Sequence, residues 1–103
     1  MIAPGEIPGE KGATVNKEVF LDIVEKVKKS GLKYKDYPNT YQINVTDTDG
    51  VIQSYYASTG TAVFRDGNSK YTAQRHTEKG MKLERFLTFC KGEEDIIATF
   101  FGV

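Results

Sequence analysis

The residues best able to act as a nucleophile or a general base are single, because the chain has one histidine, His76, and one cysteine, Cys90. A cysteine becomes a nucleophile when a base or a positive charge stabilises its thiolate. Cys90 follows Leu83 and Leu87 at helical spacing, which predicts a buried small side chain on an apolar helix face. His76 stands beside Arg75, whose charge disfavours an imidazolium. We therefore predict no catalytic residue and no enzymatic activity.

Acidic residues gather in two places, and neither has the spacing of a metal site. Asp47-Thr48-Asp49-Gly50 has the first residues of a calcium-binding loop, but Ser58 stands where such a loop needs its last acidic ligand. The same segment is typical of a hairpin turn. Glu93-Glu94-Asp95 precedes apolar residues and favours the positive end of a helix dipole. No glycine-rich phosphate motif follows a strand, so we predict no metal ion and no other cofactor.

Charge is distributed unevenly along a chain whose formal net charge is zero, with 14 basic and 14 acidic residues. Residues 26–35 hold five lysines and no acid, residues 61–91 carry an excess of four positive charges, and residues 92–103 carry three negative charges. Basic side chains on phosphates, with aromatic rings between them for base stacking, are the chemistry of single-stranded or RNA binding. The residues predicted for such a nucleic-acid surface are Lys28, Lys29, Lys33, Lys35, Arg65, Lys70, Arg75 and Arg85.

The same lysines have a structural explanation, since the helix dipole favours them at a helix end and sheet edges use them against aggregation. We therefore place a protein interaction first. Ile96, Ile97, Phe100 and Phe101 are too apolar to stay in water, so they pack on the body of the protein, which we favour, or on another chain. The residues predicted for a protein interface are Tyr34 and Tyr37 in a loop, Tyr55 on the sheet face opposite the core, and, if the C-terminal tail is exposed, Phe100 and Phe101.

The length of 103 residues, with 39% hydrophobic and 27% charged side chains, is typical of one soluble globular domain. Residues 1–13 contain Pro4-Gly5-Glu6 and Pro8-Gly9-Glu10, which favour turns, so we expect an N-terminal arm before a single domain at 14–103. We find no signal-peptide pattern and no apolar run of the ~20 residues that a membrane span needs. A lone cysteine cannot form an internal disulfide, and we expect a cytoplasmic protein without membrane contacts.

The clearest predicted element is a helix that begins near Val15, is capped by Thr14 or Asn16, and ends before Gly31. Its apolar residues recur at the helical period and form one stripe, while lysines cluster in the last turn. The members of the stripe are Val19, Phe20, Ile23, Val24 and Val27.

Four strands are predicted after a loop at 33–39, over residues 41–46, 51–58, 61–65 and 70–75. A two-residue turn at Asp49-Gly50 would place Ile43 opposite Tyr56, whereas a three-residue turn would bring Val51 and Tyr55 inward. We prefer the first because it gathers more apolar area on one face. A four-residue loop after Arg65 would place Phe64 opposite Tyr71.

A second helix is predicted over Met81–Lys91, followed by a short element at 93–101 that fits a helix or a buried strand, of which we choose the helix. Strands grouped between helices indicate an α+β fold. The sequence therefore predicts two layers: an N-terminal helix, a four-stranded antiparallel meander, and a C-terminal helix with a short terminal element. For function it predicts a non-enzymatic module that binds a protein partner or a second copy of itself, with nucleic-acid binding as the alternative.

Overall fold

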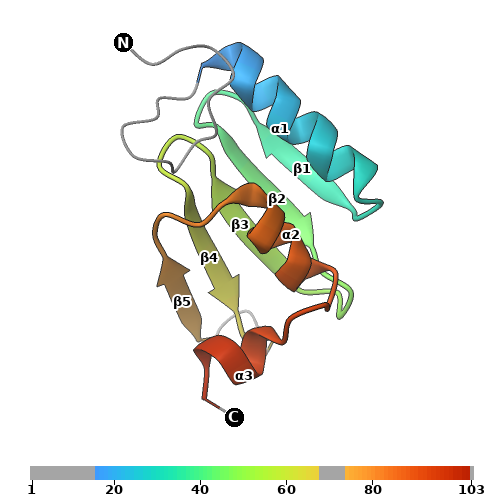
Figure 1. Cartoon of the computed structure of the whole chain (residues 1–103), viewed down its shortest axis with the longest axis vertical. Helices are drawn as coiled ribbons and strands as arrows, with labels where there is room; N and C mark the ends of the chain where they lie inside the picture. Colours follow the sequence, from blue (N-terminus) through green and yellow to red (C-terminus); the bar gives the residue numbers. More distant parts are fainter. Residues whose placement is uncertain (1–15, 68–73, 103) are drawn as a thin grey trace.

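The computed structural model describes residues 16–67 and 74–102, so the predicted arm at 1–13 lies outside the described residues. The elements, in chain order, are α1 (Lys17–Lys29), β1 (Tyr34–Tyr37), β2 (Gln42–Thr46), β3 (Ile52–Tyr56), β4 (Thr61–Arg65), β5 (Arg75–Glu78), α2 (Leu83–Cys90) and α3 (Ile96–Phe100). The strands form one antiparallel sheet in the order β1-β2-β3-β4-β5, and the helices pack on one of its faces (Figure 1). The predicted α+β architecture is confirmed, with five strands instead of four. No described helix has the length and apolar character needed to cross a membrane.

Helix α1 forms where the predicted apolar stripe and caps agree. The side chain of Asn16 accepts a hydrogen bond from the backbone N–H of Val19 at 2.9 Å, which satisfies one of the free donors at the start of the helix. Gly31, with φ at +80°, adopts the left-handed conformation that ends it. Phe20 and Val27 are fully buried against the sheet, so the lysines of the last turn lie on the outer side.

The core lies between the helices and the alternate strand residues that point toward them. Ile43, Tyr55 and Phe64 supply this covered face from three successive strands, and Phe86 of α2 packs against both aromatic rings at centroid distances of 5.1 and 5.7 Å. The Tyr55 hydroxyl donates a 2.7 Å hydrogen bond to the backbone oxygen of Met81. Burial, and secondarily the charge of Glu84, raises the pKa of this phenol.

The extra strand, β1, occupies most of the segment that we predicted as a loop at 33–39. Tyr34 pairs with Val45 and Asp36 with Ile43, so these two side chains lie on the covered side and are half-buried. Four residues with only one apolar ring on the covered side gave too weak an alternation to predict a strand. The pairing with β2 supplies what the local pattern lacks.

The register of β2 on β3 contradicts the preferred prediction: Ile43 lies opposite Tyr55, so the turn has three residues. The carboxylate of Asp47 accepts hydrogen bonds from the backbone N–H groups of Asp49 and Val51, both at 2.9 Å, and Gly50 has φ at +83°. A turn followed by a left-handed residue is the usual form of a three-residue hairpin loop. Because side chains alternate, the change of register places Tyr55 in the core and Ile52 and Tyr56 on the opposite face.

The last strand begins at Arg75, where the predicted strand at 70–75 was expected to end, so Phe64 lies opposite His76 and not Tyr71. The predicted helix at the C-terminus is confirmed as α3. Asp95 caps it by accepting hydrogen bonds from the backbone N–H groups of Ile97 and Ala98. Intramolecular packing of this segment is also found, because Phe100 stacks on the Phe64 ring at a centroid distance of 4.8 Å.

Candidate functional site

The sheet face opposite the core carries no described helix, and we call it the open face. Strand register places Lys35, Asn44, Ser54, Val63 and Thr77 in one row across it, from the β1 edge to the β5 edge. A second row, nearer to the α3 end of the molecule, contains Lys33, Thr46, Ile52, Arg65 and Arg75. None of the described residues that register places on this face is acidic, since Asp36 and Glu78 point to the covered side.

Four cations stand on the open face in two pairs. Lys33 and Lys35 are exposed at the β1 edge, whereas Arg65 and Arg75 lie directly opposite one another on β4 and β5. Strands β1 and β4 are three inter-strand spacings apart, about 14 Å in all. The two pairs therefore flank an uncharged strip formed by β2 and β3.

Arg65 is held against the sheet by its own hydrogen bonds. Its guanidinium donates to the backbone oxygen of Ile52 at 3.0 Å and to the Ser54 hydroxyl at 3.1 Å. Partial burial, and secondarily the positive charge of Arg75, lowers the pKa of Arg65, while Tyr56 acts in the opposite direction. The two guanidinium groups and the Tyr56 phenol thus share one electrostatic neighbourhood. Away from this face, Lys26 pairs with Glu84, His76 with Glu78 and Arg85 with Glu94.

The uncharged strip offers amide groups and apolar surface. The side-chain oxygen of Asn44 accepts hydrogen bonds from Gln42 Nε2 and from the Ser54 hydroxyl, both at 2.9 Å. Ile52 is 50% exposed and Tyr37 is 36% exposed. A shallow cavity of about 200 Å³ lies on the β1 side of this strip, lined by Lys33, Tyr34, Lys35, Tyr37, Asn44, Thr46 and Ile52.

Four of the residues predicted for nucleic-acid binding are brought together on the open face: Lys33, Lys35, Arg65 and Arg75. The others do not join them. Lys28 and Lys29 are at the end of α1 in the helical layer, Arg85 is on α2 within 3.8 Å of Glu94, and Lys70 lies outside the described residues.

The residues predicted for a protein interface are scattered. Only Tyr37 reaches the open face. The position predicted for Tyr55 is wrong, because this side chain is fully buried in the core. Tyr34, Phe100 and Phe101 are half-buried against the core. Sequence reasoning missed Ile52 and Tyr56 as open-face residues, and the signal that could have found them is the ability of Asp47 to close a three-residue turn.

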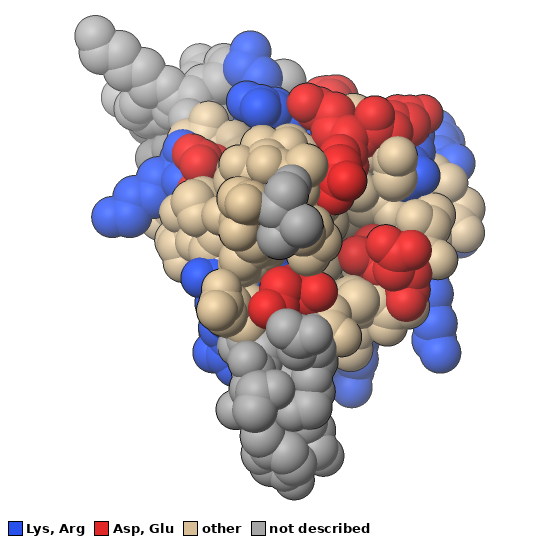
Figure 2. Space-filling view, turned by 90° about the horizontal axis from the view of Figure 1, so that it is seen from below, with Lys and Arg blue, Asp and Glu red and all other residues tan. Residues whose placement is uncertain are grey.

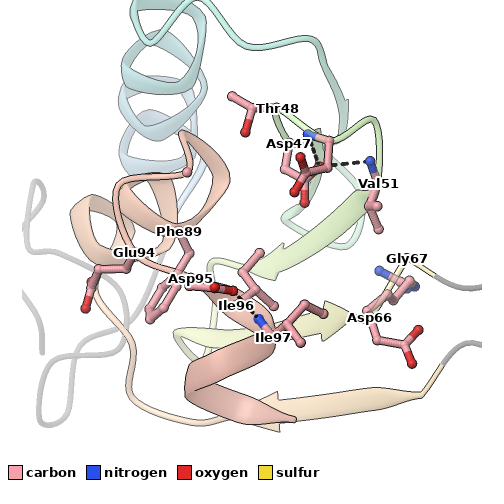
Figure 3. Close-up of a pocket in the computed structure, with 13 residues that line it drawn as sticks. Asp47, Thr48, Val51, Asp66, Gly67, Phe89, Glu94, Asp95, Ile96 and Ile97 are labelled. Atoms are coloured by element: carbon pink, nitrogen blue, oxygen red, sulfur yellow. Dashed lines mark hydrogen bonds between the residues drawn. The ribbon is translucent and has the colours of Figure 1, made fainter. Parts of the chain in front are cut away.

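A second concavity, of about 480 Å³, opens at the α3 end of the molecule and is lined by acidic residues from three loops (Figure 3). Two of these carboxylates bind the backbone of the segments that carry them. Asp47 binds backbone N–H groups of its hairpin, and Asp95 caps α3. Arg65 borders both this cavity and the open face. Viewed from this end, red carboxylate side chains surround an uncharged tan area, with blue side chains toward the rim (Figure 2).

Cys90 and His76, the candidates for a nucleophile and a general base, both pack against the core. Cys90 is fully buried, and burial, followed by the negative charge of Asp47, raises the pKa of its thiol. His76 stacks on the Phe100 ring at a centroid distance of 4.5 Å and contacts Glu78 at 3.1 Å. Among the described residues, no group of three or more His, Cys, Asp or Glu side chains is arranged to hold a metal ion.

The fold and the open face define a class of protein in general terms: a small two-layer α+β domain with one sheet face free of described helices. Comparison with family models, with curated proteins and with solved structures gives no match for this chain. The residues of the open face are therefore the feature that points to a function.

Proposed function

We propose that the protein is a non-enzymatic binding module that holds a negatively charged macromolecule on the open face of its sheet. One observation carries this proposal: four cations stand on that face without a described acidic residue among them. A protein whose formal net charge is zero has enough carboxylates to neutralise such a face, yet strand register places none of the described ones there. Charge of one sign gathered on one face offers several contacts at once to an oppositely charged partner that reaches it.

The shape of the face favours a macromolecule over a small ligand. The two cation pairs are about 14 Å apart on a broad sheet surface. The cavity beside the lysine pair, about 200 Å³, is smaller than the ~300–1,000 Å³ typical of pockets for drug-sized ligands. An extended chain could contact both pairs at once, which a compact small molecule could not.

The test is an NMR titration of the labelled protein at low salt with three anionic polymers: single-stranded DNA of about 12 nucleotides, duplex DNA of the same length, and polyglutamate. We expect at least one polymer to shift amides of Lys35, Thr46 and Arg75. The double variant Lys35→Glu with Arg75→Glu should weaken that binding at least about tenfold. The matched control is Lys28→Glu with Lys29→Glu, which changes the charge equally on α1 and should have little effect. If no polymer shifts the open face, or if the control weakens binding as much, the proposal is wrong.

A protein partner, or a second copy of the chain, is the second candidate, and the exposure of Ile52 on the middle strand of the open face favours it. Such contacts depend on apolar burial and are only weakly sensitive to salt. Sedimentation velocity at low and high salt measures self-association. An association that survives high salt and is lost in Ile52→Ser would favour this candidate over the anionic polymer.

A further inference from the structure

Resting on the proposed function, we propose that the partner is a single-stranded nucleic acid that crosses the sheet, with phosphates at the two cation pairs and one pyrimidine base in the cavity beside Ile52. The class of partner follows from the order of charged and uncharged side chains across the open face. Lys35 and Arg65 mark its charged borders, and the strip between them is uncharged.

A single strand matches this alternation because each of its units combines one negative charge with one flat uncharged ring. Its phosphates find Lys33 and Lys35 at one border and the guanidinium groups at the other. Its bases are free to turn toward the amide and apolar side chains of β2 and β3. A duplex hides the faces of its bases, and an acidic peptide brings charge without rings, so neither uses the central strip.

The cavity has the size and the lining of a seat for one base. At about 200 Å³ it suits a single ring better than a larger ligand. The ring of Tyr37 and the side chain of Ile52 offer apolar surface. Lys33 and Lys35 stand at its rim for the attached phosphate.

The polar side of the cavity offers donors to the edge of a base. Among the described residues, hydrogen bonds to Asn44 engage its side-chain oxygen, from Gln42 and from Ser54. The amide nitrogen of the same side chain is a hydrogen-bond donor on this face, and Thr46, which carries a hydroxyl, lies two residues along the same strand. The edges of thymine and uracil bases carry carbonyl oxygens, which accept such hydrogen bonds.

The experiment measures fluorescence anisotropy of the full chain with labelled oligonucleotides of about 8 units: oligothymidine, oligodeoxyadenosine and an abasic phosphodiester chain of equal length. Polyglutamate competes in a separate arm. We expect oligothymidine to bind about tenfold tighter than the abasic chain, because stacking of even one base contributes that much. Four phosphate contacts predict a salt slope near −2.8, which is about a 50-fold loss of affinity between 50 and 200 mM salt.

Two variants separate the base seat from the phosphate contacts. Ile52→Ser should weaken oligothymidine binding about fivefold and leave the abasic chain unchanged. Leu21→Ser is the matched control, because Leu21 is 53% exposed but lies on α1. Arg75→Gln should instead lower the salt slope by about 0.7 for both ligands.

The outcomes distinguish this inference from the function on which it rests. Equal affinity for the abasic chain and oligothymidine, effective competition by polyglutamate, or tighter binding of oligodeoxyadenosine would overturn the pyrimidine seat and leave the anionic binding module standing. If, in the NMR titration, an oligonucleotide shifts only amide signals of the helices, both the pyrimidine seat and the binding module on the open face are overturned. Tight oligothymidine binding that falls with Ile52→Ser and not with Leu21→Ser would support both.

Discussion

The side-chain amide of Gln53 connects the β2–β3 turn to the open face, and its replacement tests how that face is built. Gln53 is 1% exposed on the covered side of β3. Its Oε1 accepts from the backbone N–H of Arg65 at 2.6 Å, and its Nε2 donates to the Arg65 backbone oxygen at 3.1 Å and to the Asp47 carboxylate at 3.0 Å. The last backbone pair of β3 with β4 is Ser54 with Val63. The Gln53 side chain thus continues the ladder where the backbone pairing stops.

The variant Gln53→Leu removes all three hydrogen bonds while keeping most of the side-chain volume. It leaves a backbone N–H, a backbone oxygen and one carboxylate oxygen without this partner, at about 1–3 kcal/mol for each group that stays dry. Arg65 is half-buried, so water can reach part of its backbone. We therefore expect a loss of about 3 kcal/mol, a large share of the ~5–15 kcal/mol typical of a domain. The end of β4 and the Arg65 guanidinium should also lose their fixed position.

Urea unfolding followed by circular dichroism measures the loss, and amide shifts of Arg65 and Arg75 report the open face. Gln53→Glu is the informative control, because the introduced carboxylate faces Asp47 in a dry site, which raises its pKa in the folded state. A group with a raised folded pKa contributes its full stability below the unfolded pKa of about 4.3 and loses it as pH rises through the folded pKa. Gln53→Glu should therefore approach the wild type near pH 4 and fall below it at pH 7, while Gln53→Leu should show no such recovery. A loss below about 1 kcal/mol for Gln53→Leu would refute the role given to this side chain.

Two further predictions concern the core. Phe100 stacks on both Phe64 and His76, with centroid distances of 4.8 and 4.5 Å. Phe100→Ala should therefore lower the free energy of unfolding by about 2–3 kcal/mol and speed hydrogen exchange in α3, and unchanged exchange would contradict the anchoring of this helix. Burial and the charge of Asp47 raise the pKa of Cys90, so a thiol reagent at pH 8.5 should modify the folded protein far more slowly than the urea-unfolded chain, and equal rates would show that the thiol is accessible.

Local chemistry was enough to predict the helices and the class of fold. The Asn16 cap, the apolar stripe and Gly31 bound α1 within one segment of sequence, and Asp95 does the same for α3. The burial of Cys90 followed from helical spacing alone. These features depend on residues within a turn or two of each other, so the sequence order already contains their geometry.

The missed features depend on pairing between segments. Strand β1 has too few apolar residues to be predicted alone and forms because β2 offers it an edge. The β2–β3 register was decided by the Asp47 carboxylate, which closes a three-residue turn that the count of apolar residues did not favour. A single-residue shift exchanges the two faces of a strand. The error therefore placed Tyr55 outside and hid Ile52 and Tyr56, whereas four of the eight basic residues predicted for nucleic-acid binding do lie on the open face.

The same turn explains why the charges of this protein separate by location and do not cancel. The carboxylates of Asp47 and Asp95 accept hydrogen bonds from backbone N–H groups at the α3 end. Gln53 bonds to both Asp47 and the backbone of Arg65, and the Arg65 guanidinium lies across the open face. A neutral chain of this kind has little long-range attraction for a polyanion, because beyond about 10 Å the two signs offset each other and salt screens the remainder. Its affinity must come from short-range contacts on the open face. Mutation of an open-face cation should therefore change the dissociation rate more than the association rate, which stopped-flow binding can separate.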